Sequence, residues 1–313
     1  MNIKKTGSTE KIRKVAINIL RYFFLISLSY IFLYQMAYML SQAFKPYDEI
    51  YDPAIVWVPK TFTLENVKLA WSTMGYLKSF LNSLIIPVGS GMLEVFSCSL
   101  MAYGLARFKF KGNTFLFVLV ILTILIPPQM VIIPNYINYS HLDFLGVLGG
   151  ISKLVGAELR PNILDTPLTF YLPALFGVGL RSGLFIFIYR QFFAKMPREL
   201  EEAAYIDGAG PLRTFLSIII PSSSVVILTV VIFSVIWHYN DYYLSEMYMT
   251  ENNTLAVMLA SVTTSIGTQN IDPDYARVLE MAGSLIFIVP VLVMYMILQK
   301  RFIQNIDRVG IVG

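Results

Sequence analysis

Six long apolar runs constrain the fold of this chain more than any other feature of its sequence. They cover residues 16–40, 80–106, 115–138, 168–193, 223–243 and 282–299. A run of about 20 apolar residues can cross a bilayer as a helix, and helices satisfy their own backbone hydrogen bonds there. We therefore predict an all-α polytopic membrane protein with about six transmembrane helices.

The composition agrees with a chain embedded in a lipid bilayer. Hydrophobic residues make up 56% of the 313 residues and charged residues only 14%, against about 25% in soluble domains. The net charge of +4 does not indicate nucleic-acid binding, because the basic residues are bunched between apolar runs. The single Cys98 excludes a disulfide within the chain. His141 and His238 are too few and too separated to suggest a metal site.

Lys and Arg are unevenly distributed between the two sides that the six runs define. Sixteen of the 24 lie in the N-terminal segment, the 107–111 loop, the 190–213 segment and the C-terminal segment, and seven lie in the alternate loops. Cytoplasmic loops carry the excess of basic residues, so both termini and the 190–213 segment are expected in the cytoplasm. The first run is too long for a signal peptide and should be an uncleaved span.

Two parts are expected along the chain. Residues 1–79 would hold the cytoplasmic tail, the first transmembrane helix and the first external loop. Residues 80–313 would form a core of five transmembrane helices with a cytoplasmic loop at 195–221. The third run contains Pro127, Pro128 and Pro134, which should kink or end its helix.

The polar segment between the fourth and fifth runs predicts two short helices. Pro197 and Pro211 suit the first turns of helices, where a backbone N–H is not needed. Gly208 can adopt backbone angles that other residues avoid and should turn the chain between the helices. The first helix carries a small apolar stripe of Leu200, Ala203 and Ala204. The second should be anchored to the bundle by Leu212, Phe215, Ile218 and Ile219.

This segment resembles the EAA loop of the membrane subunits of binding-protein-dependent ABC importers. The pattern is E-A-A, three residues, G, nine residues and I-x-L-P. The matching residues are Glu202, Ala203, Ala204, Gly208, Ile218 and Pro221, with Ile220 where the pattern has Leu. The resemblance implies that the loop docks in a cleft of a separate ATPase subunit. It also implies that Glu202 pairs with a basic group there and that Asp207 and Gly208 shape the turn.

The resemblance covers about residues 75–313 and is closest to the carbohydrate, maltose-type group. Weaker matches are Asn82-Ser-Leu84, Tyr103–Gly112, Pro127, Pro134-Asn-Tyr136, Arg190–Phe193, Tyr239-Asn-Asp241 and the ending Phe302–Gly313, where Val312 replaces a lysine. They imply a type I ABC importer permease fold and a sugar or oligosaccharide substrate. The implied partners are a second, homologous permease subunit, an ATPase dimer and an extracytoplasmic substrate-binding protein.

No stretch of the sequence carries catalytic chemistry. The phosphate-binding pattern G-x-x-x-x-G-K-[ST] is absent, so the chain does not cradle ATP phosphates by that route. No nucleophile–base arrangement stands out either. We expect a transport subunit without catalytic, metal or cofactor-binding residues, powered by another polypeptide.

Two charged residues lie in the middle of apolar runs. Glu94 and Arg181 are at similar depth in the second and fourth runs, counting roughly 1.5 Å per residue. A charge at mid-membrane costs about 2.5–3.5 kcal/mol on insertion scales, so both should face the interior, paired with each other or lining the path. Alternatively, the glycines near Arg181 break the fourth span and its side chain snorkels to water. Tyr239, Asn240 and Asp241 complete the candidate pathway.

Other functions remain open at this stage. A permease for peptides, amino acids or an anion would share every feature above, because the sugar interpretation depends on family likeness alone. An ion-coupled secondary transporter would also have broken helices but would need no docking loop. A membrane scaffold without transport is the third alternative.

Overall fold

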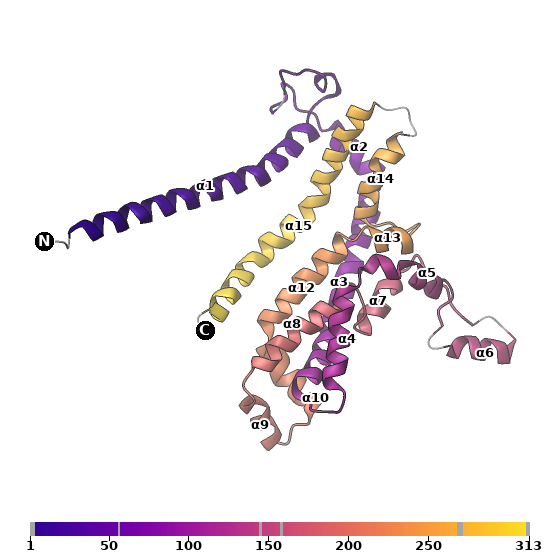
Figure 1. The fold of residues 1–313 in the computed structure, drawn as a ribbon. Helices are drawn as coiled ribbons and strands as arrows, with labels where there is room; N and C mark the ends of the chain where they lie inside the picture. The colour runs from indigo at the N-terminus through magenta and orange to yellow at the C-terminus, as the bar shows by residue number, and fades with distance from the viewer. Residues whose placement is uncertain (1–3, 56, 144–145, 157–158, 268–271, 311–313) are drawn as a thin grey trace. The chain divides into compact units, whose positions relative to one another are not determined.

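The computed structural model describes residues 4–55, 57–143, 146–156, 159–267 and 272–310, and the regular elements of these residues are all helices (Figure 1). In chain order they are α1 (Lys4–Ala43), η1 (Tyr47–Glu49), α2 (Glu65–Thr73), α3 (Tyr76–Arg107), α4 (Asn113–Leu125), η2 (Pro128–Val131), α5 (Ile132–Ser140), α6 (Val147–Val155), α7 (Leu168–Leu175), α8 (Ser182–Lys195), α9 (Glu199–Ile206), α10 (Pro211–Thr214), the π-helix η3 (Phe215–Ile219), α11 (Ile220–Ser222), α12 (Ser224–Tyr239), α13 (Tyr243–Tyr248), α14 (Leu255–Gly267) and α15 (Pro273–Gly310). The all-helical prediction is confirmed.

The chain divides into two compact units. The first contains residues 1–73 and 262–288, and the second contains residues 74–261 and 289–313. In the first unit, polar contacts order the loop after α1. Asn66 Nδ2 donates hydrogen bonds to the carbonyls of Ala43 and Lys45, at 3.2 and 2.7 Å, and Lys45 Nζ donates one to the Ile55 carbonyl at 2.6 Å.

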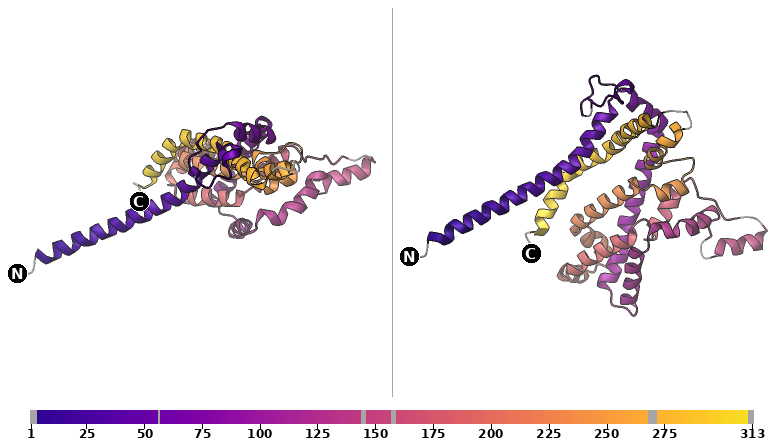
Figure 2. Two further views of the ribbon diagram at one scale, coloured as in Figure 1. Left: turned by 90° about the horizontal axis from the view of Figure 1, so that it is seen from above. Right: turned by 45° about the horizontal axis from the view of Figure 1, so that its top comes forward.

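The second unit is built around α3. This helix packs against α7, α8 and α12, and α4 packs against α8 (Figures 1 and 2). The packed stripe of α3 recurs every three or four residues, as expected for one helix face. Its buried members are small or apolar apart from one carboxylate: Ser83, Ile86, Ser90, Glu94, Cys98 and Ala102. Small side chains let the neighbouring helices approach this face closely.

Three helices within the described residues are long and apolar enough to cross a membrane. They are Arg13–Ala43, Tyr76–Arg107 and Pro273–Gln299, and they correspond to the first, second and sixth predicted runs. Two bent helix pairs correspond to the third and fifth. Asn113–Leu125 and Pro128–Ser140 meet at 98°, and Pro211–Ser222 and Ser224–Tyr239 meet at 80°. The break in the third run falls at its first two prolines, as predicted.

The fourth run is two helices, so the prediction of one span over 168–193 is wrong. Helix α7 ends at Leu175 and α8 begins at Ser182. Between them Gly177 and Arg181 have φ angles of 66° and 63°, which lie in the left-handed region that a right-handed helix cannot contain. The glycine-rich break weighed as an alternative is therefore the one found.

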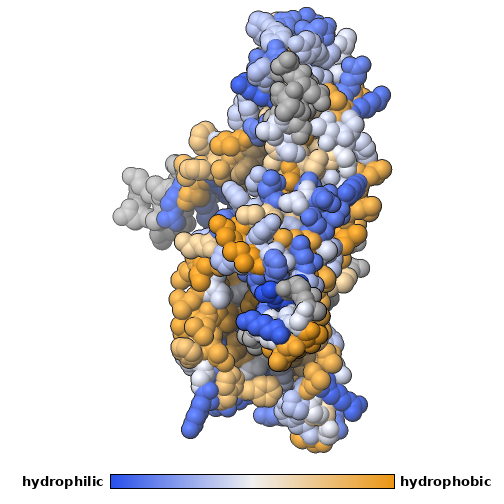
Figure 3. Space-filling model, turned by 90° about the vertical axis from the view of Figure 1, so that its right-hand side faces the viewer, coloured by the Kyte–Doolittle hydropathy of each residue, from blue (hydrophilic) through white to orange (hydrophobic). Residues whose placement is uncertain are grey.

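Hydrophobic side chains are widely exposed along the described helices. Figure 3 shows broad hydrophobic areas on one face of the molecule. In α1, side chains such as Phe32 and Ile26 are 71% and 68% exposed. Large exposed apolar areas mark contact with protein or lipid, as a membrane protein requires.

Candidate functional site

The loop between α8 and α12 contains the short helix α9 and a glycine turn. The Gly208 N–H donates to the Tyr205 carbonyl at 3.1 Å, and the Ala209 N–H donates to the Ala204 carbonyl at 2.9 Å. With Gly208 at a φ of 79°, these two bonds form a Schellman motif, which closes a helix with a left-handed residue. The predicted turn at Gly208 is confirmed. Pro197 lies just before the first helical residue, Glu199, rather than within the first turn.

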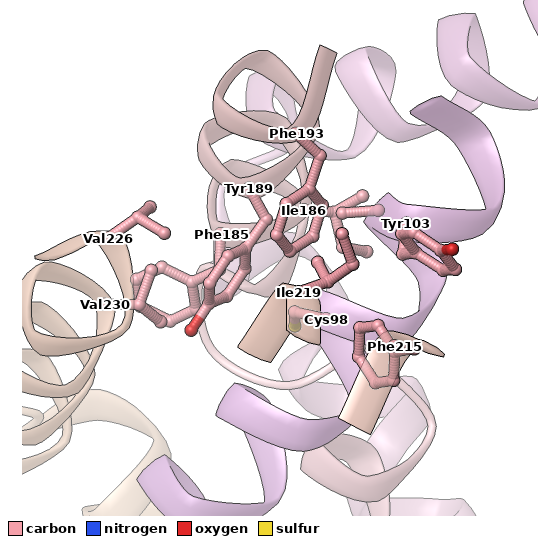
Figure 4. Close-up of a cluster of buried hydrophobic side chains, with 11 residues drawn as sticks. Cys98, Tyr103, Phe185, Ile186, Tyr189, Phe193, Phe215, Ile219, Val226 and Val230 are labelled. Carbon is pink, nitrogen blue, oxygen red and sulfur yellow. The ribbon is translucent and has the colours of Figure 1, made fainter. Parts of the chain in front are cut away.

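The second part of the loop is anchored in a buried aromatic cluster. Phe215 and Ile219 project from the π-helix toward Tyr103 and Phe193 (Figure 4), and all four side chains are at most 2% exposed. The Tyr103 and Phe215 ring centroids lie 5.1 Å apart. The predicted anchoring by Leu212 is wrong, because its side chain is 61% exposed. The wide π-helical turn shifts the helical register between Leu212 and Ile219.

A buried ion pair ties the same loop to the end of α3. Arg107 Nε lies 2.7 Å from Glu201 Oε1, and the two side chains are 5% and 9% exposed. The two atoms meet without the geometry of an N–H···O hydrogen bond. The Arg107 guanidinium also donates to the Met196 carbonyl at 2.9 Å. This pair was not predicted from the sequence, although an Arg at the end of an apolar run and a Glu beside E-A-A could have suggested it.

The other side of α9 is exposed. Glu202, Ala203 and Ile206 face solvent, with Ile206 86% exposed, whereas Ala204 is 4% exposed. The predicted apolar stripe is therefore divided, because Ala204 packs inward and Ala203 points outward. Asp207 and Gly208 are also exposed. We call Glu202, Ala203 and Ile206 the exposed face of α9.

Glu94 lies at the junction of three helices and is completely buried. Its carboxylate accepts hydrogen bonds from Ser234 Oγ of α12 at 2.6 Å and from Ser182 Oγ of α8 at 3.1 Å. His238 Nδ1 lies 4.0 Å from the same carboxylate. The predicted interior position of Glu94 is thus found, and its partners are hydroxyls.

Arg181 does not form an ion pair with Glu94, so the pairing alternative is not found among the described residues. Its guanidinium carbon lies 5.7 Å from the centroid of the Trp237 ring, a cation–π distance. The residue precedes α8 with a φ of 63°. Its side chain is exposed to a cavity in the second unit.

That cavity has a volume of about 240 Å³ and lies where the helices are broken. Its polar lining includes Thr123, Asn135, Arg181, Ser182, His238 and Tyr248. We call it the Arg181 cavity. Arg181, one of the predicted pathway residues, therefore lies beside a polar space. Ser182, whose hydroxyl donates to Glu94, lines the same cavity.

The other three predicted pathway residues are placed differently. Tyr239 is 6% exposed and lines a separate apolar cavity with Tyr76 and other side chains. Asn240 Nδ2 donates to the Ile236 carbonyl at 2.8 Å. Asp241 accepts hydrogen bonds from the N–H and Oγ of Ser245, at 2.9 and 3.1 Å, and so caps α13. The structure does not bring these residues to the Arg181 cavity.

Three comparisons with known proteins agree on the class of this chain. The sequence profile of the family described as "binding-protein-dependent transport system inner membrane component" matches residues 98–308. A diacetylchitobiose uptake permease of Streptomyces coelicolor is 26% identical over 284 residues, covering 91% of this chain and 85% of that protein. A probable starch degradation products permease of Thermoanaerobacterium thermosulfurigenes is 28% identical over 251 residues, covering 80% and 81%.

A solved structure supports the same fold. The crystal structure of a bacterial ABC transporter involved in the import of the acidic polysaccharide alginate matches with a TM-score of 0.69. The match covers 93% of this chain and 98% of that chain at 18% sequence identity. The chain therefore has the ABC importer permease fold.

Proposed function

This chain belongs to the family of binding-protein-dependent transport system inner membrane components, and from that premise we propose how it moves its substrate. It is a multi-pass inner membrane permease and not the ATPase of the importer. We propose that it carries a sugar or oligosaccharide inward by alternating access, with ATP hydrolysed by separate subunits. The names of the carbohydrate-uptake relatives above support this substrate class.

The exposed face of α9 carries the proposal. It joins one carboxylate, Glu202, to a small residue and an unpartnered apolar side chain, Ile206. A basic partner with a shallow apolar cleft would fit this face, because the carboxylate attracts the partner and the Ala203 side chain allows close approach. We infer that this partner is the ATPase subunit.

Two sets of contacts would transmit movement of the loop to the membrane helices. The Arg107–Glu201 pair connects α9 to α3, and the π-helix with its buried Phe215 connects the loop to the aromatic cluster (Figure 4). Closely packed interiors transmit displacement because they are not easily compressed. A movement of α9 imposed by the ATPase would therefore move the membrane helices.

We propose three further partners and an orientation. A second, homologous permease subunit would pair with this one, a second ATPase subunit would complete the dimer, and an extracytoplasmic binding protein would deliver the substrate. The excess of Lys and Arg on one side supports cytoplasmic termini and a cytoplasmic α9 loop.

A pull-down with matched variants tests this proposal. The solubilised wild-type protein should bring down an ATPase, a second permease and a binding protein, identified by mass spectrometry. Glu202→Lys combined with Gly208→Pro should lose only the ATPase. Glu251→Lys, a charge reversal at an exposed residue outside this loop, should lose none. A wild-type sample without an ATPase, whose transport collapses with an ion gradient, would contradict the proposal and favour a secondary transporter.

A further inference from the structure

We propose that the Arg181 cavity binds one acidic sugar residue, with its carboxylate on Arg181 and its hydroxyls against the polar side chains of the cavity wall. This inference rests on the proposed function and narrows its substrate class to saccharides that contain a uronic acid. It also assigns part of the membrane substrate site to this subunit.

The position of the cavity is the first argument. Its walls include the break between α4 and η2, the break between α7 and α8, and the start of α8. Within a membrane, irregular backbone is tolerated where it is covered by protein or lines a water-filled cavity. Secondary transporters place their substrate sites at discontinuous helices, and the broken helices here offer the same kind of irregular backbone.

The second argument is an uncompensated positive charge. Among the described residues no carboxylate forms an ion pair with Arg181, whose guanidinium instead lies near the Trp237 ring. Glu94, the partner considered from the sequence, accepts hydrogen bonds from two serine hydroxyls instead. Arg181 also stands at the positive end of the 14-residue helix α8. An anion is therefore the ligand that this wall of the cavity favours.

Arginine sets the chemical class of that anion. Its guanidinium offers paired N–H groups that match the two oxygens of a carboxylate or phosphate. A bound carboxylate would also neutralise the charge of the Arg181 guanidinium. The left-handed backbone at Arg181 is strained for a residue with a side chain, and strain of this kind is concentrated at functional sites.

A uronic acid presents both complementary groups on one ring. Its carboxylate suits Arg181, and its hydroxyls suit the polar lining that includes Thr123, Asn135 and Tyr248. The cavity volume of about 240 Å³ is below the roughly 300–1,000 Å³ of sites for drug-sized ligands. It therefore suits a single sugar residue of a longer chain.

A pair of matched sugars tests the inference. D-galacturonate and D-galactose differ only in a carboxylate that replaces a hydroxymethyl group. Binding of each is measured by saturation-transfer NMR on the complete importer in nanodiscs of phosphatidylcholine. We expect the wild type to bind galacturonate at least about tenfold more tightly than galactose, a difference of about 1.4 kcal/mol. Arg181→Met should remove this preference.

Two further variants separate binding from folding. Arg181→Lys keeps the charge and should keep part of the preference, although it loses the paired N–H geometry. Lys153→Met, which removes a positive charge from the last turn of α6, should leave the preference unchanged. A preference that survives in Arg181→Met, or a wild type without one, would overturn the inference.

An anionic lipid headgroup is the other source of the same chemistry. The measurement is therefore repeated with phosphatidylglycerol in the nanodiscs. Retained galacturonate preference supports the sugar site, whereas its abolition, with Arg181-dependent binding of the lipid, assigns the cavity to the headgroup and overturns the inference. A wild-type importer that takes up neutral oligosaccharides without any acid preference contradicts only this inference. An importer that takes up no saccharide contradicts the proposed function as well.

Discussion

The α9 loop and the Arg181 cavity differ in how their functional residues are assembled. In the loop, Glu202, Ala203 and Gly208 lie within seven consecutive residues, and the glycine turn fixes their arrangement locally. The cavity takes its residues from separate helices, including Arg181 before α8 and His238 in α12. A site of the first kind can be read from spacing, and a site of the second kind depends on packing.

The largest effect is expected where the loop meets the packed helices. Arg107→Glu should destabilise the protein by about 3–5 kcal/mol, because it removes one partner of a buried ion pair and places a second carboxylate beside Glu201. Thermal unfolding of the purified complex measures this loss, and uptake should fall with it. Arg198→Glu, at an exposed position just before α9, is the matched control and should change the stability little.

The charge-swapped double variant sharpens this result. Arg107→Glu combined with Glu201→Arg restores an opposite-charge pair and should recover part of the lost stability. A double variant as unstable as the sum of the two single variants would mean that the pair does not connect α9 to α3.

A substitution with about half that loss of stability tests the packing around Glu94. A Cβ at Gly179 would lie 2.7 Å from Glu94 Oε1 and 3.0 Å from the Ala174 backbone. Gly179→Ala should therefore cost about 1–3 kcal/mol through overpacking. Gly104→Ala is the control in α3, since a Cβ there meets nothing within 4 Å, and it should be neutral or stabilising. Equal unfolding temperatures for the two variants would show that the Gly179 contact is not close.

A smaller, local effect is expected at the turn of the loop. Gly208→Ala places a side chain at a φ of 79°, which costs about 1–2 kcal/mol, although a Cβ there meets nothing within 4 Å. The variant should release this strain by changing the turn, which displaces α9 and weakens ATPase binding. Gly208→Asn should be better tolerated, because Asn adopts the left-handed region more readily. Equal affinity for Ala and Gly would contradict the role of the turn.

The smallest effect concerns an aspartate outside the membrane helices. Partial burial raises the pKa of Asp165, but hydrogen bonds from the Glu251 N–H and Thr250 Oγ1, both at 2.7 Å, lower it more, and the net pKa is below its usual value. Its stabilising contribution is therefore present above the unfolded pKa and is lost as the pH falls through the folded pKa, below about 4. The free energy of unfolding is measured for Asp165→Asn and the wild type between pH 7 and pH 3. The difference between the two proteins should become smaller in acid. A constant difference would contradict it.

The comparison also explains how much the sequence alone could predict. The apolar runs, each long enough to cross a bilayer, predicted the all-helical class. The two adjacent prolines predicted the break in the third run. Both predictions succeeded because they depend on consecutive residues. The break in the fourth run was only one of two alternatives, since glycines permit a break without requiring it. The exposure of Leu212 could not be anticipated, because helical spacing does not show which face of a short helix packs against its neighbours.

The contacts across helices were the least predictable part. The depth of Glu94 suggested Arg181 as its partner, but the carboxylate is bound by Ser182 and Ser234. Serines are common in apolar runs, and nothing in the sequence distinguishes these two. The sequence did not suggest a metal-binding role for His238. Its position beside the cavity follows only from the fold.

The central claim is that the exposed face of α9 receives the ATPase while its other face is held by the permease. Ala203→Cys and Ala204→Cys test it directly, because these neighbours differ in exposure and the native Cys98 is buried. Each variant is labelled with a maleimide-linked benzophenone and irradiated in the assembled importer. We predict a crosslink to the ATPase subunit from position 203 and little from position 204. Equal crosslinking from both positions, or none from position 203, would contradict the account.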